Sequence, residues 1–128
     1  MLHYISNILA LVEQRIWYLR KQPDHHFFRG HATYLSGLRE EIQEAEEEIT
    51  KGRQVYLEDE LGDIFWDYLC LIETLNQEGR INRDRIFERC YKKFSERIPH
   101  DGMATPESWE IVKNRQKKNL EDEHNWVI

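Results

Sequence analysis

Two pairs of acidic residues with matched spacing lie on either side of Gly52. The pairs are Glu41 with Glu44 and Glu60 with Asp63, and they stand at equal distances from that glycine. Residues three apart share one face of a helix, so two antiparallel helices that turn at Gly52 would bring all four carboxylates together. Four carboxylates repel one another unless a cation offsets their charge. The spacing therefore predicts a site for a hard divalent metal, whose natural further ligand is a polyphosphate.

The rotation of the two helices agrees with this arrangement. At about 100° per residue, each helix carries its acids on the same rotational side of its apolar stripe. The acids are Glu41, Glu44 and Glu48 in the first helix, and Glu60, Asp63 and Asp67 in the second. When the two apolar stripes pack together, the acidic sides of the helices meet only if the helices are antiparallel. The short connection around Gly52 favours that topology.

Acidic pairs alone are weak indicators, because helices rich in Glu and Lys are usually only solvated surfaces. Gly62 adds support, since it lies between Glu60 and Asp63 in an otherwise good helix. A glycine there costs about 1 kcal/mol relative to alanine. Its presence suggests a close approach by another backbone or a ligand.

The whole chain is predicted to be all-α, a bundle of four to five helices that includes the antiparallel acidic pair. Glycine and proline are scarce, and apolar residues recur at helical spacing. The predicted helices cover about 3–21, 32–51, a third that contains Leu57 and ends near 78, 83–98, and a fifth that starts at Thr105-Pro106-Glu107. Pro23 is read as the stop of the first helix and Gly52 as the stop of the second.

Periodicity also predicts which apolar residues face inward. In the second helix these are Leu35, Leu38, Ile42, Ala45 and Ile49. In the third helix they are Leu57, Leu61, Ile64, Phe65, Tyr68, Ile72 and Leu75. In the fourth helix they are Ile86, Phe87, Cys90, Phe94 and Ile98.

Composition narrows the class of protein. A chain of 128 residues fits one domain over 1–128, and a net charge of −6 argues against a nucleic-acid surface. No apolar run approaches a membrane span, and no secretory signal is apparent. Cys70 and Cys90 are too few and too far apart for a disulfide framework or a zinc site. We therefore expect a soluble cytoplasmic protein with two buried free thiols and no nucleic-acid or membrane partner.

Two alternatives to a metal-dependent phosphate site stay open at this point. A di-iron carboxylate bundle needs a Glu-x-x-His on each of two helices, and only Glu121 with His124 fits that pattern. A non-catalytic helical module would use the charged faces to bind a protein partner.

Four ordered segments stand out along the chain, Glu40-Glu41-x-x-Glu44, Glu60-Leu61-Gly62-Asp63, Lys93-x-x-x-Arg97-Ile98-Pro99-His100 and Trp109-x-x-x-Lys113, which together cover about 35–117. In this order they resemble the MazG family of all-α nucleoside triphosphate pyrophosphohydrolases. There are two departures: 25–33 lacks the tryptophan and glutamine of longer members, and Ile98 stands where a histidine is usual. Both departures bear on which base is accepted, and neither touches the acidic residues.

The resemblance implies hydrolysis of a nucleoside triphosphate between its α and β phosphates, giving a nucleoside monophosphate and pyrophosphate. It implies Mg²⁺ as the cofactor, with Mn²⁺ as a substitute, held by Glu41, Glu44, Glu60 and Asp63. Such an ion bridges carboxylate and phosphate oxygens and neutralises charge in the transition state. Glu40, Glu41 and Glu44 are the candidates for the carboxylate that activates the attacking water. Neither the number of ions nor the preferred base follows from the residues.

The same resemblance places basic and aromatic residues on the substrate. Lys93 and Arg97 would hold phosphate oxygens, with Lys113 in a similar role. Trp109 either stacks on a base or packs in the core, and packing is the commoner state of such a tryptophan. Asp67 is read as a water-holder or a partner of Lys93, rather than a further metal ligand. His31 and His100 are weaker candidates for substrate contact.

The chain is also predicted to form a homodimer or a tetramer. It carries more large apolar side chains than one buried face per helix requires. These include Trp17, Tyr18, Phe27, Phe28, Trp66 and Trp126. Members of the family that the chain resembles generally pair, with the nucleotide site near the subunit contact.

Overall fold

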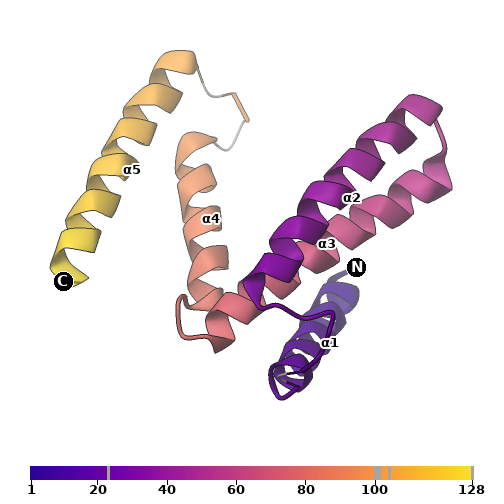
Figure 1. Cartoon of the computed structure of the whole chain (residues 1–128). Helices are drawn as coiled ribbons and strands as arrows, with labels where there is room; N and C mark the ends of the chain where they lie inside the picture. The colour runs from indigo at the N-terminus through magenta and orange to yellow at the C-terminus, as the bar shows by residue number, and fades with distance from the viewer. Residues whose placement is uncertain (23, 100–101, 104, 128) are drawn as a thin grey trace. The chain divides into compact units, whose positions relative to one another are not determined.

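The computed structural model describes residues 1–22, 24–99, 102–103 and 105–127, and it confirms the all-α prediction (Figure 1). Five helices follow one another: α1 (Leu2–Arg20), α2 (His31–Lys51), α3 (Gln54–Gln77), α4 (Arg83–Arg97) and α5 (Pro106–Val127). Pro23 and His100, both named in the predictions above, lie outside the described residues. In the described part of the chain, no helix combines the length and apolarity that a membrane span needs.

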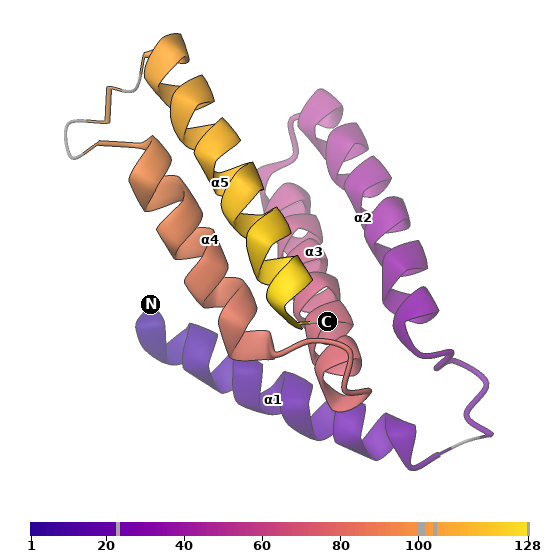
Figure 2. The same cartoon turned by 90° about the vertical axis from the view of Figure 1, so that its left-hand side faces the viewer.

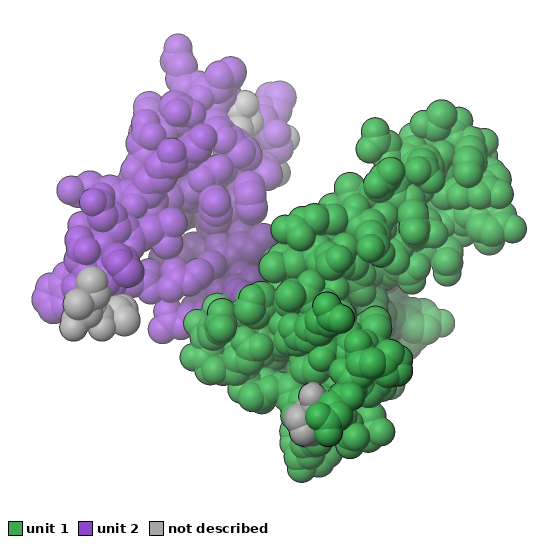
Figure 3. All heavy atoms as spheres, in the orientation of Figure 1, with its two compact units in different colours: residues 1–83 green, residues 84–128 purple. Residues whose placement is uncertain are grey.

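The chain divides into two compact units, Met1–Arg83 and Asp84–Ile128, which Figure 3 colours separately. The first unit holds α1, α2 and α3, and the second holds most of α4 and all of α5. Each unit is described by itself below. That residues 1–128 form a single domain stays a prediction.

In the first unit, α2 and α3 form the antiparallel hairpin that the acidic spacing predicts (Figures 1 and 2). Gly52 ends α2 in the left-handed conformation, with a φ of 67°, and its N–H donates to the carbonyl oxygen of Glu48 at 3.0 Å. Glycine adopts this conformation without steric cost, which is why it commonly ends a helix. Arg53 then donates from Nε to Glu48 Oε2 at 2.7 Å, so an ion pair secures the turn.

The hydrophobic core lies at the end of the hairpin away from Gly52, where α1 packs against it. Its buried members are Val12, Ile16, Leu19, Tyr34, Leu69 and Cys70, with Ile8, Leu9, Phe28, Trp66 and Leu71 packed around them. Burial of a large aliphatic side chain contributes about 1.5–3 kcal/mol, so this small set anchors one end of the hairpin. The acidic pairs lie farther along the hairpin, toward the turn.

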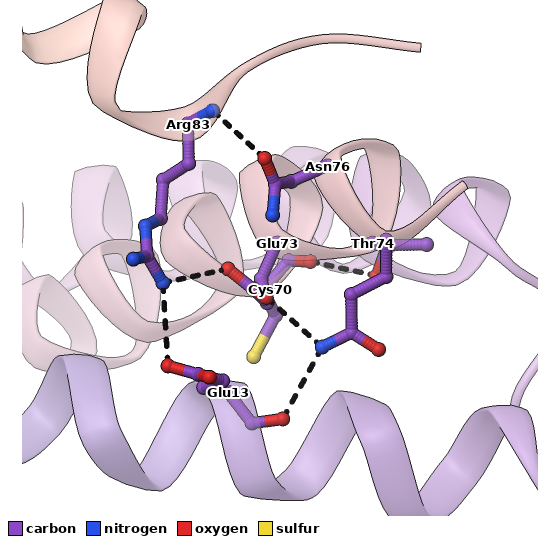
Figure 4. Close-up of polar contacts among 7 residues, drawn as sticks. Glu13, Cys70, Glu73, Thr74, Asn76 and Arg83 are labelled. Carbon is purple, nitrogen blue, oxygen red and sulfur yellow. Dashed lines mark hydrogen bonds and ion pairs between the residues drawn. The ribbon is translucent and has the colours of Figure 1, made fainter. Parts of the chain in front are cut away.

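A buried polar network fastens α1 to the last turns of α3 (Figure 4). Glu73 is only 2% exposed, and it accepts from Arg83 Nη1 at 3.0 Å and from Gln77 Nε2 at 2.9 Å. Gln77 also donates to the carbonyl oxygen of Glu13 on α1, at 3.3 Å. Because both carboxylate oxygens of Glu73 have donors, its burial is compensated and the network holds the base of the hairpin in place.

Several residues predicted to face inward are exposed instead. On α2 and α3 these are Leu35, Ile42, Ile49, Leu61, Phe65 and Tyr68, on α4 they are Phe87, Cys90 and Phe94, and Ile98 directly follows α4. Ile42 is 55% exposed and Ile49 is 63% exposed, whereas Ala45 between them is buried. A hairpin of two helices buries only the seam between them, and the apolar stripe is wider than that seam. Periodicity identified an apolar face but not what covers it.

In the second unit, α4 and α5 lie side by side and antiparallel (Figures 1 and 2). Arg89 of α4 makes a two-pronged ion pair with Glu123 of α5, at 3.1 and 2.5 Å. The predicted start of α5 is confirmed, because Thr105 and Ser108 accept each other's backbone N–H on their side-chain oxygens, both at 3.1 Å. This reciprocal pair satisfies two of the free donors at the start of the helix.

Candidate active site

Three of the four predicted metal-binding carboxylates converge between α2 and α3. Glu41 of α2 and Glu60 and Asp63 of α3 each offer an oxygen atom, and these three atoms lie within 4.8 Å of one another. Two facing antiparallel helices position them, so the predicted approach of the acids across the hairpin is confirmed. We call Glu41, Glu60 and Asp63 the acidic triad.

The fourth residue, Glu44, is exposed and lies outside the triad. Its charge nevertheless acts on the triad, since it helps to raise the pKa of Glu41 and the pKa of Asp63. Burial is the largest cause for Asp63, followed by the charges of Asp59 and Glu44. Glu44 therefore lies close enough to interact electrostatically with an ion bound at the triad.

The triad has oxygens that lack donors. Glu41 Oε2 and Glu60 Oε2 are buried, and neither accepts a hydrogen bond from any described residue. When a proton is shared between these two carboxyls, they bond to each other. That hydrogen bond is the main reason why the pKa of Glu41 rises to about 8, followed by burial and the charges of Glu44, Glu60 and Asp63. Near neutral pH the pair needs either a proton or a cation.

This donor set fits a hard divalent cation. Mg²⁺ and Mn²⁺ prefer carboxylate oxygens, and the buried oxygens without donors offer such ligands at one point. The triad supplies three carboxylates, which leaves coordination positions for water or a phosphate oxygen. Imidazole and thiolate ligands are absent from this triad, so it does not favour zinc.

A cavity of about 550 Å³ opens next to the triad. It lies between the loop before α2, the first turns of α2, and α3. Its lining includes Phe27, Arg29, Thr33, Gly37, Glu41 and Asp67. The volume falls within the range of small-molecule sites, about 300–1,000 Å³. Because Glu41 belongs to both the cavity and the triad, a molecule in the cavity would reach an ion held by the triad.

Thr33 ties the loop before α2 to the helix, and so shapes one wall of the cavity. The N–H of Arg29 donates to Thr33 Oγ1 at 2.6 Å, and the Thr33 hydroxyl donates to the carbonyl oxygen of Phe27 at 3.4 Å. Phe27 is 51% exposed, so its ring remains available on this wall. The sequence did not predict this cavity, because it depends on how the loop before α2 lies against α2 and α3.

The glycine that matters for close packing is Gly37, and not Gly62. A Cβ atom built at Gly62 meets no described atom within 4 Å, so no described backbone of this chain makes the predicted close approach, and the alternative, a ligand, stays a prediction. A Cβ atom at Gly37 would lie 2.7 Å from Asp67 Oδ2. Gly37 stands four residues before Glu41 on the same helix face, and that spacing is the sequence signal that could have identified it.

The predicted phosphate-binding residues belong to the second unit. Lys93 is exposed, whereas Arg97 is only 9% exposed. The Arg97 guanidinium lies 5.2 Å from the ring centre of Trp109, and its Nε donates to Gln116 Oε1 at 2.9 Å. Trp109 is half-buried and its ring lies 6.3 Å from that of Phe94, so packing within the unit is its observed state. Contact of these residues with a substrate stays a prediction.

Two further candidates, His31 and Lys113, and the two cysteines differ in their surroundings. His31 Nδ1 lies 3.7 Å from Glu78 Oε2 in the first unit, so it pairs with an acid rather than lining the triad. Lys113 is half-buried on α5. Cys70 and Cys90 are both free thiols, as predicted, although only Cys70 is buried.

Comparison with known protein families agrees with this geometry. Residues 29–101, more than half of the chain, match the MazG nucleotide pyrophosphohydrolase domain. The matched range contains the acidic triad and, of the cavity-lining residues named above, all except Phe27. Comparison with curated proteins and with solved structures gave no match.

Proposed function

The chain belongs to the MazG nucleotide pyrophosphohydrolase family, and on that premise we propose that it cleaves nucleoside triphosphates between the α and β phosphates. The products are a nucleoside monophosphate and pyrophosphate. The observation that carries this proposal is the acidic triad, with its buried oxygens lacking donors, beside a cavity of about 550 Å³. A triphosphate in this cavity would bring its charged end to the triad and its nucleoside toward Phe27.

In this proposal Glu41, Glu60 and Asp63 hold the divalent ion, and Glu44 is the fourth carboxylate of the set. When bound, Mg²⁺, or Mn²⁺ in its place, would neutralise charge on the phosphates and polarise the bond to be cleaved. Because these residues come from two helices, they would hold the ion between α2 and α3 and so orient the phosphates relative to the hairpin.

A carboxylate next to the ion would orient and deprotonate the attacking water. Glu40 is exposed and lines the cavity, so it can reach solvent and substrate together. Glu41 and Glu44 are the other candidates, and a carboxylate that holds an ion is a weaker base than one beside it. We therefore favour Glu40 for this role.

Lys93 and Lys113 are the residues proposed to neutralise phosphate oxygens. Arg97 is already engaged with Trp109 and Gln116, so its guanidinium has fewer free donors than the Lys93 ammonium. Asp67 lines the cavity on the side of the triad toward the hydrophobic core. Its role in substrate binding is developed in the next subsection.

We also propose that the protein is cytoplasmic and forms a homodimer or a tetramer. The exposed apolar residues of α2 and α3, which include Leu35, Ile42 and Ile49 at intervals of seven, support an interface on that face. A partner hairpin would bury these side chains as the seam between α2 and α3 buries Ala45.

One experiment tests the proposed activity. The purified protein is incubated with a panel of nucleoside triphosphates bearing standard, oxidised and uracil bases, with Mg²⁺, with Mn²⁺ or with EDTA. Pyrophosphate and monophosphate are expected in the presence of metal, and neither is expected with EDTA. Release of orthophosphate instead would place the cleavage at the γ phosphate. No product from any nucleotide would favour the non-catalytic interaction module.

A further inference from the structure

The carboxylate of Asp67 packs against the backbone of α2 at Gly37. A Cβ atom at position 37 would lie 2.7 Å from Asp67 Oδ2 and 3.4 Å from Asp67 Cγ. Gly37 lies inside a helix and has no left-handed φ, so its backbone conformation does not require glycine. Glycine is a poor helix former, and the clearance that it gives to Asp67 accounts for its presence.

Asp67 faces the cavity. It is half-buried and lines the cavity together with Gly37, and no described residue of the first unit gives it a hydrogen bond or an ion pair. A partly buried carboxylate without a donor is unfavourable unless a ligand or water supplies one. Burial, and then the charges of Asp63 and Glu40, raise the pKa of Asp67.

The position of Asp67 along α3 indicates which part of a substrate it meets. Asp67 lies four residues from Asp63, about 6 Å along the helix axis. If the triad holds the phosphates through an ion, the next part of the molecule is the nucleoside. A carboxylate repels phosphate oxygens but accepts hydrogen bonds from hydroxyl and amino groups.

We propose that Asp67 is a specificity-determining residue, which accepts a hydrogen bond from an O–H or N–H group of the substrate nucleoside, and that Gly37 gives it the room to do so. This inference rests on the proposed function. The donor is either a sugar hydroxyl or an amino group of the base, and both offer the same chemistry to the carboxylate. Nucleotides without the donor are poorer substrates, because they leave the carboxylate unpaired.

The test compares matched substrates in the wild type, in Asp67→Ala and in Asp67→Asn. One pair differs in the sugar, a 2′-deoxynucleotide against its 2′,3′-dideoxy analogue. The other pair differs in the base, deoxycytidine triphosphate against deoxyuridine triphosphate. In one of the two pairs, we expect the wild type to have a higher kcat/KM for the nucleotide that bears the donor than for the one that lacks it. Asp67→Ala should lower the ratio of these two kcat/KM values about tenfold, which corresponds to the loss of one charged hydrogen bond. Asp67→Asn keeps an amide oxygen and is expected to retain part of the preference.

Gly37 is tested by a double-mutant cycle. Gly37→Ala alone is expected to lower the same ratio, because the new methyl group displaces the Asp67 carboxylate. In the Asp67→Ala background the same change is expected to have no further effect, since the clashing atoms are gone. Melting temperatures of all variants exclude unfolding, and Glu58→Ala, an exposed acid on α3 outside the cavity, is the control that leaves the ratio unchanged.

The outcomes separate the two proposals. If both ratios are the same in Asp67→Ala as in the wild type while turnover continues, the inference about Asp67 is wrong and the proposed function stands. If Asp67→Ala lowers turnover of all four nucleotides equally, the residue acts on the triad or the fold and the inference is again wrong. Absence of pyrophosphate from every nucleotide with the wild type would overturn the proposed function, and this inference with it.

Discussion

Glu41 on α2 approaches Glu60 on α3 across the hairpin, and Glu41 Oε2 and Glu60 Oε2 are both buried without a hydrogen bond from any described residue. The arrangement makes the site respond to protons and to cations through the same pair of oxygens. A proton on the pair and an ion between the carboxylates are alternatives, because each neutralises the same negative charge.

Stability of the metal-free protein should fall as the pH rises. The pKa of Glu41 is about 8 in the folded protein against an ordinary value of 4.5, so the folded state binds more protons than the unfolded state between these values. The contribution of this group to stability is complete below about pH 4.5 and is lost as the pH rises through about 8. Melting temperatures in EDTA across this window measure the effect.

Two comparisons make the assignment to Glu41 specific. Glu41→Gln should flatten the pH dependence, and Mg²⁺ should raise the melting temperature most at the alkaline end, where the proton is gone. A melting temperature in EDTA that climbs steadily from pH 5 to pH 8, as happens when salt-bridged carboxylates dominate, would contradict the raised pKa of Glu41.

Glu60→Gln should abolish metal-dependent turnover without unfolding the protein. The change removes a metal ligand, which should lower kcat/KM by on the order of a hundredfold or more. It also removes one charge from a repulsive cluster, so the melting temperature in EDTA should stay equal or rise. Glu47→Gln, an exposed residue of α2 outside the triad, is the matched control. Full activity of Glu60→Gln would remove the triad from the mechanism.

Glu73→Ala should destabilise the first unit strongly, whereas Glu13→Ala should not. The Glu73 side chain is 3% exposed and pairs with Arg83, while the Glu13 side chain is 62% exposed. Loss of a buried partner costs about 3 kcal/mol, and loss of an exposed one costs less than about 1 kcal/mol. Urea denaturation followed by circular dichroism measures both variants. Equal effects would mean that the network in Figure 4 does not anchor α1 to α3.

Ile49→Lys should shift the protein toward the monomer in size-exclusion chromatography with light scattering. Ile49 is 63% exposed on the apolar face that we propose as the subunit interface, and a charge buried there would lack a partner. Thr50→Lys places the same charge one residue away, outside the apolar stripe, and should leave the oligomer intact. A wild type that elutes as a compact monomer would contradict the proposed interface.

The sequence predicted the hairpin and the approach of Glu41 to Glu60 and Asp63, because helical periodicity, rotation and a turn-forming glycine are all local properties. It could not predict that Ile42 and Ile49 are exposed, since periodicity identifies an apolar face without its neighbour. It also did not identify Gly37, where the close approach within the chain occurs. The contact of Gly37 with Asp67 depends on how two helices are aligned side by side, which no single-helix pattern contains.

The half of the hairpin nearer Gly52 has few buried residues between α2 and α3. On α2 only Ala45 and Glu48 are buried beyond Glu41, and the residues of α3 from 54 to 68 are all exposed or half-buried. An ion held by Glu41 and Glu60 would therefore act as a reversible cross-link that closes the chain segment between them. Amide protons in that segment should exchange with solvent more slowly when the ion is bound. The exchange rate at the tip of the hairpin therefore indicates whether the site holds an ion.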